Sequence, residues 1–156
     1  MRFAPLLSIA VAFLLTAMPL PASIIAFKPD WVALTMIYWT LAAPPAFGLL
    51  GALLVGLVLD TLTGALLGQH ALGLLLIVYV AGRLRPRLRT FPAAQSTVVV
   101  AALLVANEFL LLWIDGIAGR TVPIGERWPP VVSGTLLWLV AWSTFDRGRE
   151  HAPARL

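Results

Sequence analysis

The sequence has no cysteine, a single lysine (Lys28) and few charged residues for its length. Without cysteine, it has no disulfide framework and no thiolate chemistry. Charged residues make up 12% of the 156 residues, whereas about a quarter of an ordinary soluble domain is charged. Hydrophobic residues make up 60% and form several long runs. These values exclude an ordinary soluble protein and predict one integral membrane domain over residues 1–156.

Residues suited to catalysis or metal binding are also scarce. The chain has two histidines, His70 and His151, and no zinc-protease, phosphate-loop or serine-hydrolase motif. We therefore predict that the protein is not an enzyme and has no cofactor or metal site. His70 stands alone and is expected to be a hydrogen-bonded residue rather than a metal ligand. No folded region outside the membrane is long enough to bind nucleic acid.

Six apolar segments predict an all-α, polytopic fold with about six short transmembrane helices, at residues 3–20, 26–43, 46–60, 70–82, 92–115 and 130–146. We interpret the first as a span, because no clean small-residue cleavage site of a signal peptide follows it. A five-span protein is the alternative. The second, third and fourth segments are shorter than the roughly 20 residues of a typical span. For the third and fourth, one long span plus a re-entrant piece is the alternative.

The loop charges predict the orientation. With six spans, one side carries eight basic residues: Arg2, Arg83, Arg85, Arg87, Arg89, Arg147, Arg149 and Arg155. The other side carries only Lys28, Arg120 and Arg127. Basic residues concentrate on the cytoplasmic side, so both termini are expected there. Arg83 to Arg89 would form a cytoplasmic basic loop that contacts anionic lipid or a partner, or that only sets the orientation.

Small residues recur every fourth position in the central stretch, interrupted by one acid: Gly48, Ala52, Gly56, Asp60, Gly64 and Gly68. Small residues four apart let two membrane helices approach closely. Because residues four apart drift around the helix, the row favours a right-handed crossing. It predicts a surface for a partner helix or for packing within the protein. The alternative is that glycine is simply frequent in membrane helices.

The second span is rich in aromatic residues. Asp30 follows the break at Lys28-Pro29 and is expected to cap the helix that begins at Trp31. Trp31, Tyr38 and Trp39 would fix the depth of this helix at the membrane interface or pack against other helices.

Two acids and one amide at membrane depth are the most costly polar residues there: Asp60, Glu108 and Asn107. An acid is costly in lipid, so these side chains should face protein or water. Asp60 could bond to local backbone amides near Gly64, contact a partner, or belong to a proton or ion path. We favour the first two accounts over transport, because all basic residues are expected in loops or tails.

The order of these motifs resembles the rod shape-determining protein MreD family. The resemblance rests on Phe27-Lys28-Pro29-Asp30-Trp31, on Tyr38-Trp39 before Pro44, and on Asp60-x-x-x-Gly64-x-x-x-Gly68-Gln69-His70-Ala71-Leu72. It covers nearly the whole chain, although the last two spans match only as hydrophobic segments.

The resemblance implies a non-enzymatic component of the bacterial inner-membrane machinery for cell elongation. It implies binding to the transmembrane helix of MreC, and through MreC a link between the filament protein MreB, the peptidoglycan synthase RodA and its penicillin-binding transpeptidase. The implied fold is similar to the substrate-binding subunit of vitamin transporters. A substrate-binding subunit of a small-molecule uptake transporter is therefore the alternative function.

Overall fold

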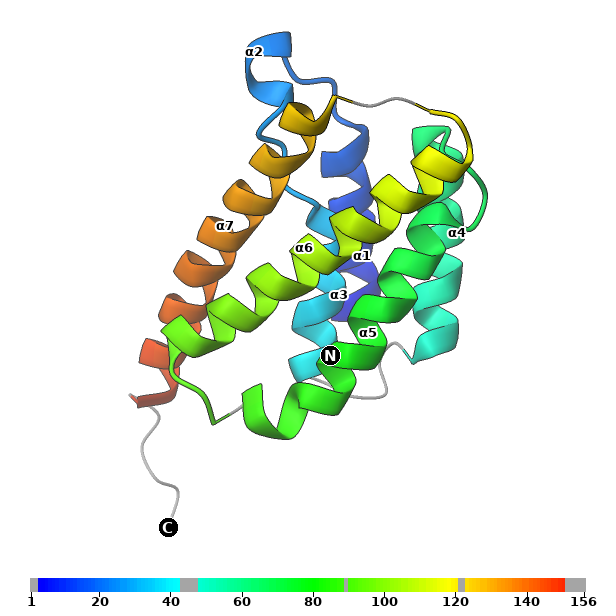
Figure 1. Cartoon of the computed structure of the whole chain (residues 1–156). Helices are drawn as coiled ribbons and strands as arrows, with labels where there is room; N and C mark the ends of the chain where they lie inside the picture. The colour runs from blue at the N-terminus through cyan, green and yellow to red at the C-terminus, as the bar shows by residue number, and fades with distance from the viewer. Residues whose placement is uncertain (1–2, 43–47, 89, 121–122, 151–156) are drawn as a thin grey trace.

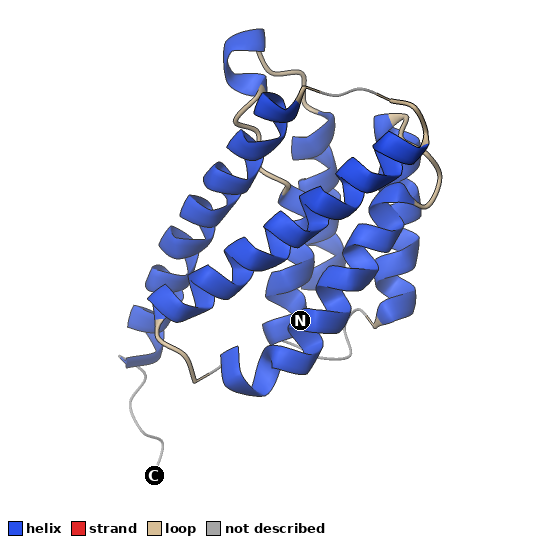
Figure 2. Ribbon diagram, viewed as in Figure 1, coloured by secondary structure: helices blue, strands red, loops and turns tan. Residues whose placement is uncertain are grey.

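The computed structural model describes residues 3–42, 48–88, 90–120 and 123–150, and every regular element in these ranges is a helix (Figure 2). The helices are α1 (Ala4–Ala17), α2 (Ala22–Ile25), α3 (Trp31–Ala42), α4 (Leu49–Thr63), α5 (Gln69–Leu88), α6 (Ala93–Ile117) and α7 (Ile124–Glu150). The prediction of an all-α protein is confirmed. Six of the helices are long, and α2 is a single turn.

Successive long helices run in opposite directions (Figure 1). Helices α1, α4 and α6 run toward the upper end of the bundle, and α3, α5 and α7 return toward the lower end. The α1–α3, α4–α5 and α6–α7 connections therefore lie at the upper end. The start of α1 and the end of α7 both lie at the lower end.

Helices α3 and α5 form the centre of the bundle. Helix α3 packs against α1 and α5, while α5 also packs against α4 and α6, and α7 packs mainly on α6. Because α3 is nearly all apolar, it can bury residues around most of its surface. Its core residues Val32, Met36 and Ile37 meet Leu74 and Ile77 of α5 in one hydrophobic cluster.

The outer surface of the bundle is also apolar. Leu14 on α1, Leu50 on α4 and Val140 on α7 are each more than 60% exposed, and many other large apolar side chains share this property. A soluble protein rarely exposes so much contiguous apolar surface, whereas hydrocarbon makes it favourable. By length and hydropathy, α6 is the one helix of the described residues that qualifies as a membrane span, and α1, α3 and α4 are shorter apolar helices.

The turn before α3 uses both of its charged side chains. Lys28 Nζ donates to the carbonyls of Thr16 and Met18, which are left open at the end of α1. The Asp30 carboxylate accepts a hydrogen bond of 2.9 Å from the Ala33 amide and caps α3. The Lys-Pro-Asp-Trp sequence therefore joins the end of one helix to the start of the next.

Two helix ends differ from the expected ones. The expected basic loop is helical as far as Leu88, and this prediction is wrong for Arg83, Arg85 and Arg87; Arg89 lies outside the described residues. The buried Leu88 extends the packed face of α5 beyond Gly82, and Arg85 Nε donates to the Leu41 carbonyl at the end of α3 over 3.1 Å. The Arg83 guanidinium lies 5.5 Å from the centre of the Tyr79 ring.

Helix α7 begins six residues before the expected span and includes Pro129 and Pro130. Proline removes a backbone donor and normally interrupts a helix. Here tertiary contacts hold the first turns, because Arg127 pairs with α6 and the Trp128 ring meets Phe109 edge to face at 5.8 Å. The sequence alone suggested a loop there because it showed the prolines but not these contacts.

Part of the row of small residues packs inside the protein. Ala52, Gly56 and Asp60 are buried on α4, and Gly56 lies against the backbone of Ala71 on α5. A Cβ at Gly56 would lie 2.6 Å from the Ala71 amide nitrogen, closer than real Cβ atoms come. Gly48 has open space around it. Gly56 thus allows the close contact between α4 and α5.

Gly56→Ala should lower the free energy of unfolding by about 1–3 kcal/mol, because a methyl group would force α4 and α5 apart. Gly48→Ala is the matched control and should have little effect. Thermal unfolding in detergent, followed by circular dichroism, compares the two variants. Equal stability of both would contradict the close α4–α5 contact.

Candidate functional site

The turn between α4 and α5 is built around the carboxylate of Asp60, whose side chain is fully buried. One carboxylate oxygen accepts from the Gly68 amide over 2.7 Å. The other accepts from the His70 amide over 2.7 Å and lies 2.9 Å from His70 Nδ1. Asp60 therefore caps the start of α5 through its side chain, whereas the Gly64 amide donates to the Asp60 backbone carbonyl.

Two glycines shape this turn. Gly64 and Gly68 have φ angles of 66° and 99°, in the region that residues with a Cβ rarely adopt. Gly64 ends α4 in the left-handed conformation. The chain can then return and present the amides at the start of α5 to Asp60. Both glycines thus serve a local turn, with open space where a side chain would be.

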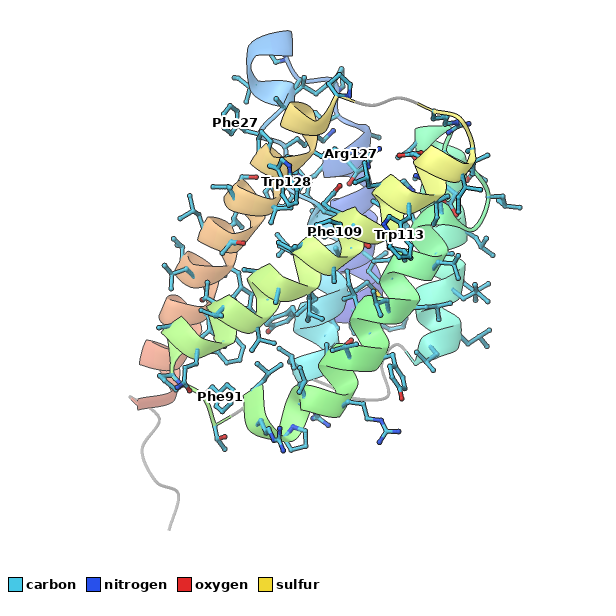
Figure 3. The ribbon with its side chains drawn as sticks, viewed as in Figure 1. Phe27, Phe91, Phe109, Trp113, Arg127 and Trp128 are labelled. Atoms are coloured by element: carbon cyan, nitrogen blue, oxygen red, sulfur yellow. The ribbon has the colours of Figure 1, made fainter. Side chains whose placement is uncertain are left out.

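A second polar group lies beside the first and is centred on Arg127. Arg127 Nη2 donates to Asp115, and its Nη1 lies 3.8 Å from a carboxylate oxygen of Glu108. The other Asp115 oxygen accepts from the Gln69 side-chain amide over 2.9 Å. Figure 3 shows Arg127 in the upper half of the bundle, with Trp128 and Phe109 nearby on α7 and α6. This arrangement ties α5, α6 and α7 together.

The two groups form one upper polar cluster, which we define as Asp60, Gln69, His70, Glu108, Asp115 and Arg127. Asp30, at the start of α3, interacts electrostatically with both His70 and Glu108. Five helices therefore meet at this end of the bundle through charged or polar side chains. Because these groups bond mainly to one another, the cluster is suited to holding helices in place.

Arg127 corrects one expectation from the sequence. We expected all basic residues in loops or tails, and this is wrong for Arg127, whose side chain is 11% exposed and paired with two acids. Gln69 and Asp115 were also not among the site residues expected from the sequence. One signal was available: Glu108 and Asp115 are seven residues apart, which places them on one face of a helix two turns apart. Two acids on one buried face require a basic partner.

Asn107 lies where α5 and α6 cross. Its side chain is buried and packs directly on Gly73, whose missing Cβ leaves room for the amide. The neighbouring Glu108 turns to Arg127. The two adjacent polar residues of the fifth predicted span therefore contact different helices, and both face protein.

An apolar groove opens on the side of the bundle between α1 and α7, with α3 as its floor. It has a volume of about 230 Å³ and is lined by Ser8, Trp31, Leu34, Thr35, Tyr38, Trp39, Leu137, Trp138 and Ala141. An adjoining hollow of about 430 Å³ on the α1 side shares Ser8, Trp31 and Thr35. We call the two together the α1–α3–α7 groove. All three aromatic residues predicted from the second span line it.

The aromatic residues of the groove are held in defined positions. Trp39 Nε1 donates to the Ser8 hydroxyl over 2.7 Å, which joins α3 to α1. The Tyr38 and Trp39 rings meet edge to face, with centres 5.3 Å apart. Trp31 and Trp39 are eight residues apart, so the floor extends roughly 12 Å along α3. The groove is thus a long, rigid, mostly apolar surface that faces outward from the side of the helical bundle.

A helical bundle that is apolar both inside and outside, with its buried charges paired near one end, defines a helical membrane protein. A family model described as rod shape-determining protein MreD matches residues 1–142. The chain belongs to this family of bacterial membrane proteins. The resemblance found in the sequence motifs is confirmed.

One curated relative supports this assignment. The rod shape-determining protein MreD of Haemophilus influenzae is 32% identical over 103 residues. The alignment covers 65% of this chain and 64% of that relative, so the chain matches somewhat less than two thirds of the relative's length. No solved structure matches the chain, and the expected similarity to vitamin-transporter subunits stays a prediction.

Proposed function

We propose that the protein is a non-enzymatic scaffold of the cell-elongation complex in the bacterial inner membrane. Its six long helices cross the membrane, with both termini in the cytoplasm. It binds the transmembrane helix of MreC and, through MreC, positions RodA and its penicillin-binding transpeptidase relative to MreB. Membership of the shape-determining family supports this role.

The observation that carries the proposal is the α1–α3–α7 groove. Helix α3 is packed on its other sides, but between α1 and α7 its aromatic face stays partly uncovered. In lipid, helices associate through close packing and hydrogen bonds rather than through the hydrophobic effect. A rigid floor flanked by two helices offers such packing to a third helix. The smaller side chains Ser8, Thr35 and Ala141 leave room for it.

The small-residue row supports a partner surface less well than the groove does. Gly56 is occupied by α5, so a bulky residue there would disturb the fold as well as any partner contact. Loss of MreC binding in such a variant would therefore not identify the docking surface. Substitutions in the groove give the more direct test.

The lower end of the bundle is basic and fits the cytoplasmic side. Arg83 and Arg87 are exposed near the end of α5, where each contributes about 1 kcal/mol of attraction to an anionic leaflet. This placement supports the proposed orientation, with the upper polar cluster toward the periplasm.

The absence of cysteine from the chain permits a direct test by disulfide cross-linking. Single cysteines at Thr35 and Leu137, within the groove, should each cross-link to a cysteine series along the MreC transmembrane helix. Leu54→Cys is the matched control, because Leu54 is exposed on α4 away from the groove. We expect cross-links at the groove positions with a helical period of three to four residues along MreC.

Cross-linking at Leu54 with none at Thr35 or Leu137 would contradict docking in the groove. Cell shape provides the second measurement. Thr35→Trp, which fills the groove, should abolish copurification with MreC and produce round cells. Rod-shaped cells with intact copurification would contradict the proposal.

A further inference from the structure

The outer face of α4 is apolar over only a short distance along the helix. Helix α4 packs mainly on α5, and on its outer side Leu50, Leu54 and Leu62 are each more than 50% exposed. Leu50 and Leu62 are separated by twelve residues, so the stripe extends roughly 18 Å. Because the hydrocarbon core of a typical bilayer is about 30 Å thick, this stripe is too short to cross it.

The turn after α4 sets the upper limit of the lipid-facing surface. From Gly64 to Gly68 the chain is not helical, and Gly64 and Leu67 are exposed. Irregular backbone that faces lipid does not occur within the hydrocarbon region, because its polar groups would have no partners there. The turn therefore lies at the level of the headgroups, and the hydrocarbon ends below it, near Gln69 at the start of α5.

Arg83 sets the lower limit on α5. The residue is exposed, and its guanidinium lies 5.5 Å from the centre of the Tyr79 ring. Tyr79 is one turn nearer the middle of the bundle, so the charge is turned toward the middle and is not extended away from it. Arginine charges stay in the headgroup region or water, so the hydrocarbon ends above Arg83. Fourteen residues separate Gln69 from Arg83, which is roughly 21 Å, and helix tilt only reduces this height.

The opposite side of the bundle is long enough for an ordinary bilayer. On α6, twenty residues separate the exposed Gln95 from Asp115, or roughly 30 Å. On α7, nineteen residues separate Arg127 from Asp146, or roughly 28 Å. The apolar surface of the protein is therefore shorter along α4 and α5 than along α6 and α7.

We propose that the bilayer is thinned locally beside α4 and α5, and that this face selects phospholipids with short acyl chains. The shortfall is roughly 9 Å against a typical hydrocarbon core. A helix cannot stretch, and further tilt would enlarge the shortfall, so the lipid adapts instead. The inference rests on the proposed membrane-spanning arrangement but not on the binding of MreC. It assigns the α4–α5 face to lipid of a particular length.

The test compares the lipid composition at two faces of the same protein. Because the chain has no cysteine, a single cysteine can carry a bimane fluorophore at Leu54 on α4 or at Leu136 on α7, which are 56% and 59% exposed. The full-length protein is reconstituted in mixtures of 14-carbon and 22-carbon phosphatidylcholine, with bromine, a quencher, on one lipid at a time. We expect the 14-carbon lipid to be enriched about threefold at Leu54 and to match the bulk mixture at Leu136.

Two outcomes of this comparison would overturn the inference in different ways. Equal composition at Leu54 and Leu136 would show that the bilayer is not thinned at the α4–α5 face, while quenching at both positions would still support helices in contact with lipid. Failure of either lipid to quench the Leu54 fluorophore would show that α4 does not face lipid. The proposed membrane-spanning arrangement would then fail as well.

A pair of arginine variants tests the physical reason. Arg83→Leu lengthens the apolar face of α5 by about one turn, so the enrichment of the 14-carbon lipid at Leu54 should fall toward the bulk value. Arg87→Leu is the matched control: Arg87 is also exposed on α5, but Arg83 remains above it and the enrichment should persist. Unchanged enrichment in Arg83→Leu would overturn the inference. The cross-linking and copurification tests of the groove do not involve these arginines, so docking of MreC stands or falls independently.

Discussion

Replacing Arg127 with methionine should lower the free energy of unfolding by about 3–5 kcal/mol, the loss expected when one partner of a buried ion pair is removed. Methionine keeps much of the side-chain volume but leaves Asp115 and Glu108 without a positive charge between them. Because these contacts hold the first turns of α7, we expect α7 to separate from α6 at its upper end. Thermal unfolding in detergent measures the stability, and protease sensitivity near residue 127 reports the separation.

Arg120→Met is the control, since Arg120 is an exposed arginine in the same part of the chain. A triple variant tests the physical reason. Adding Glu108→Gln and Asp115→Asn to Arg127→Met removes the uncompensated negative charges, and it should restore part of the lost stability. If Arg127→Met is as stable as Arg120→Met, the upper polar cluster does not hold α7.

Asp60→Ala should lower the free energy of unfolding by about 3 kcal/mol or more. The substitution removes the acceptor for the Gly68 and His70 amides and for His70 Nδ1. A buried group left without its partner costs about 1–3 kcal/mol. The α4–α5 turn should open, which hydrogen exchange at these two amides would detect directly.

Two further variants separate the contributions of these hydrogen bonds to the loss of stability. His70→Ala should cost less than Asp60→Ala, because both backbone amides keep their acceptor. Thr61→Ala is the control, since the exposed Thr61 only donates to the Val58 carbonyl one turn earlier. Fast exchange of the Gly68 and His70 amides already in the parent protein would contradict the cap assigned to Asp60.

The upper polar cluster and the groove are connected through α7. Arg127 fixes the upper end of this helix, and Gly134 lets it approach α6 and α3 closely, because a Cβ there would lie 3.2 Å from Leu104 and 3.8 Å from Leu34. One turn further, Trp138 forms the wall of the groove. The cluster therefore sets the position of a surface that it does not touch, and Arg127→Met should also weaken binding of the partner helix.

Several features followed from local sequence. The Asp30 cap depends on residues within one turn, and the composition of each apolar run indicates a helix in lipid whatever its neighbours are. The family was identified from short motifs in order. The helix ends near Leu88 and Ile124 did not follow, because they depend on contacts with α3 and α6 that lie far away in the chain.

The sequence by itself determined that this protein is helical and belongs in a membrane, since the transfer of apolar residues into hydrocarbon depends on composition and run length alone. Only the tertiary structure decided that Gly56 faces α5, that Arg127 pairs with two acids of α6, and that the aromatic residues of α3 form the floor of a groove. Each of these features depends on the distance between residues that are remote in sequence, and that distance is set by how the helices pack.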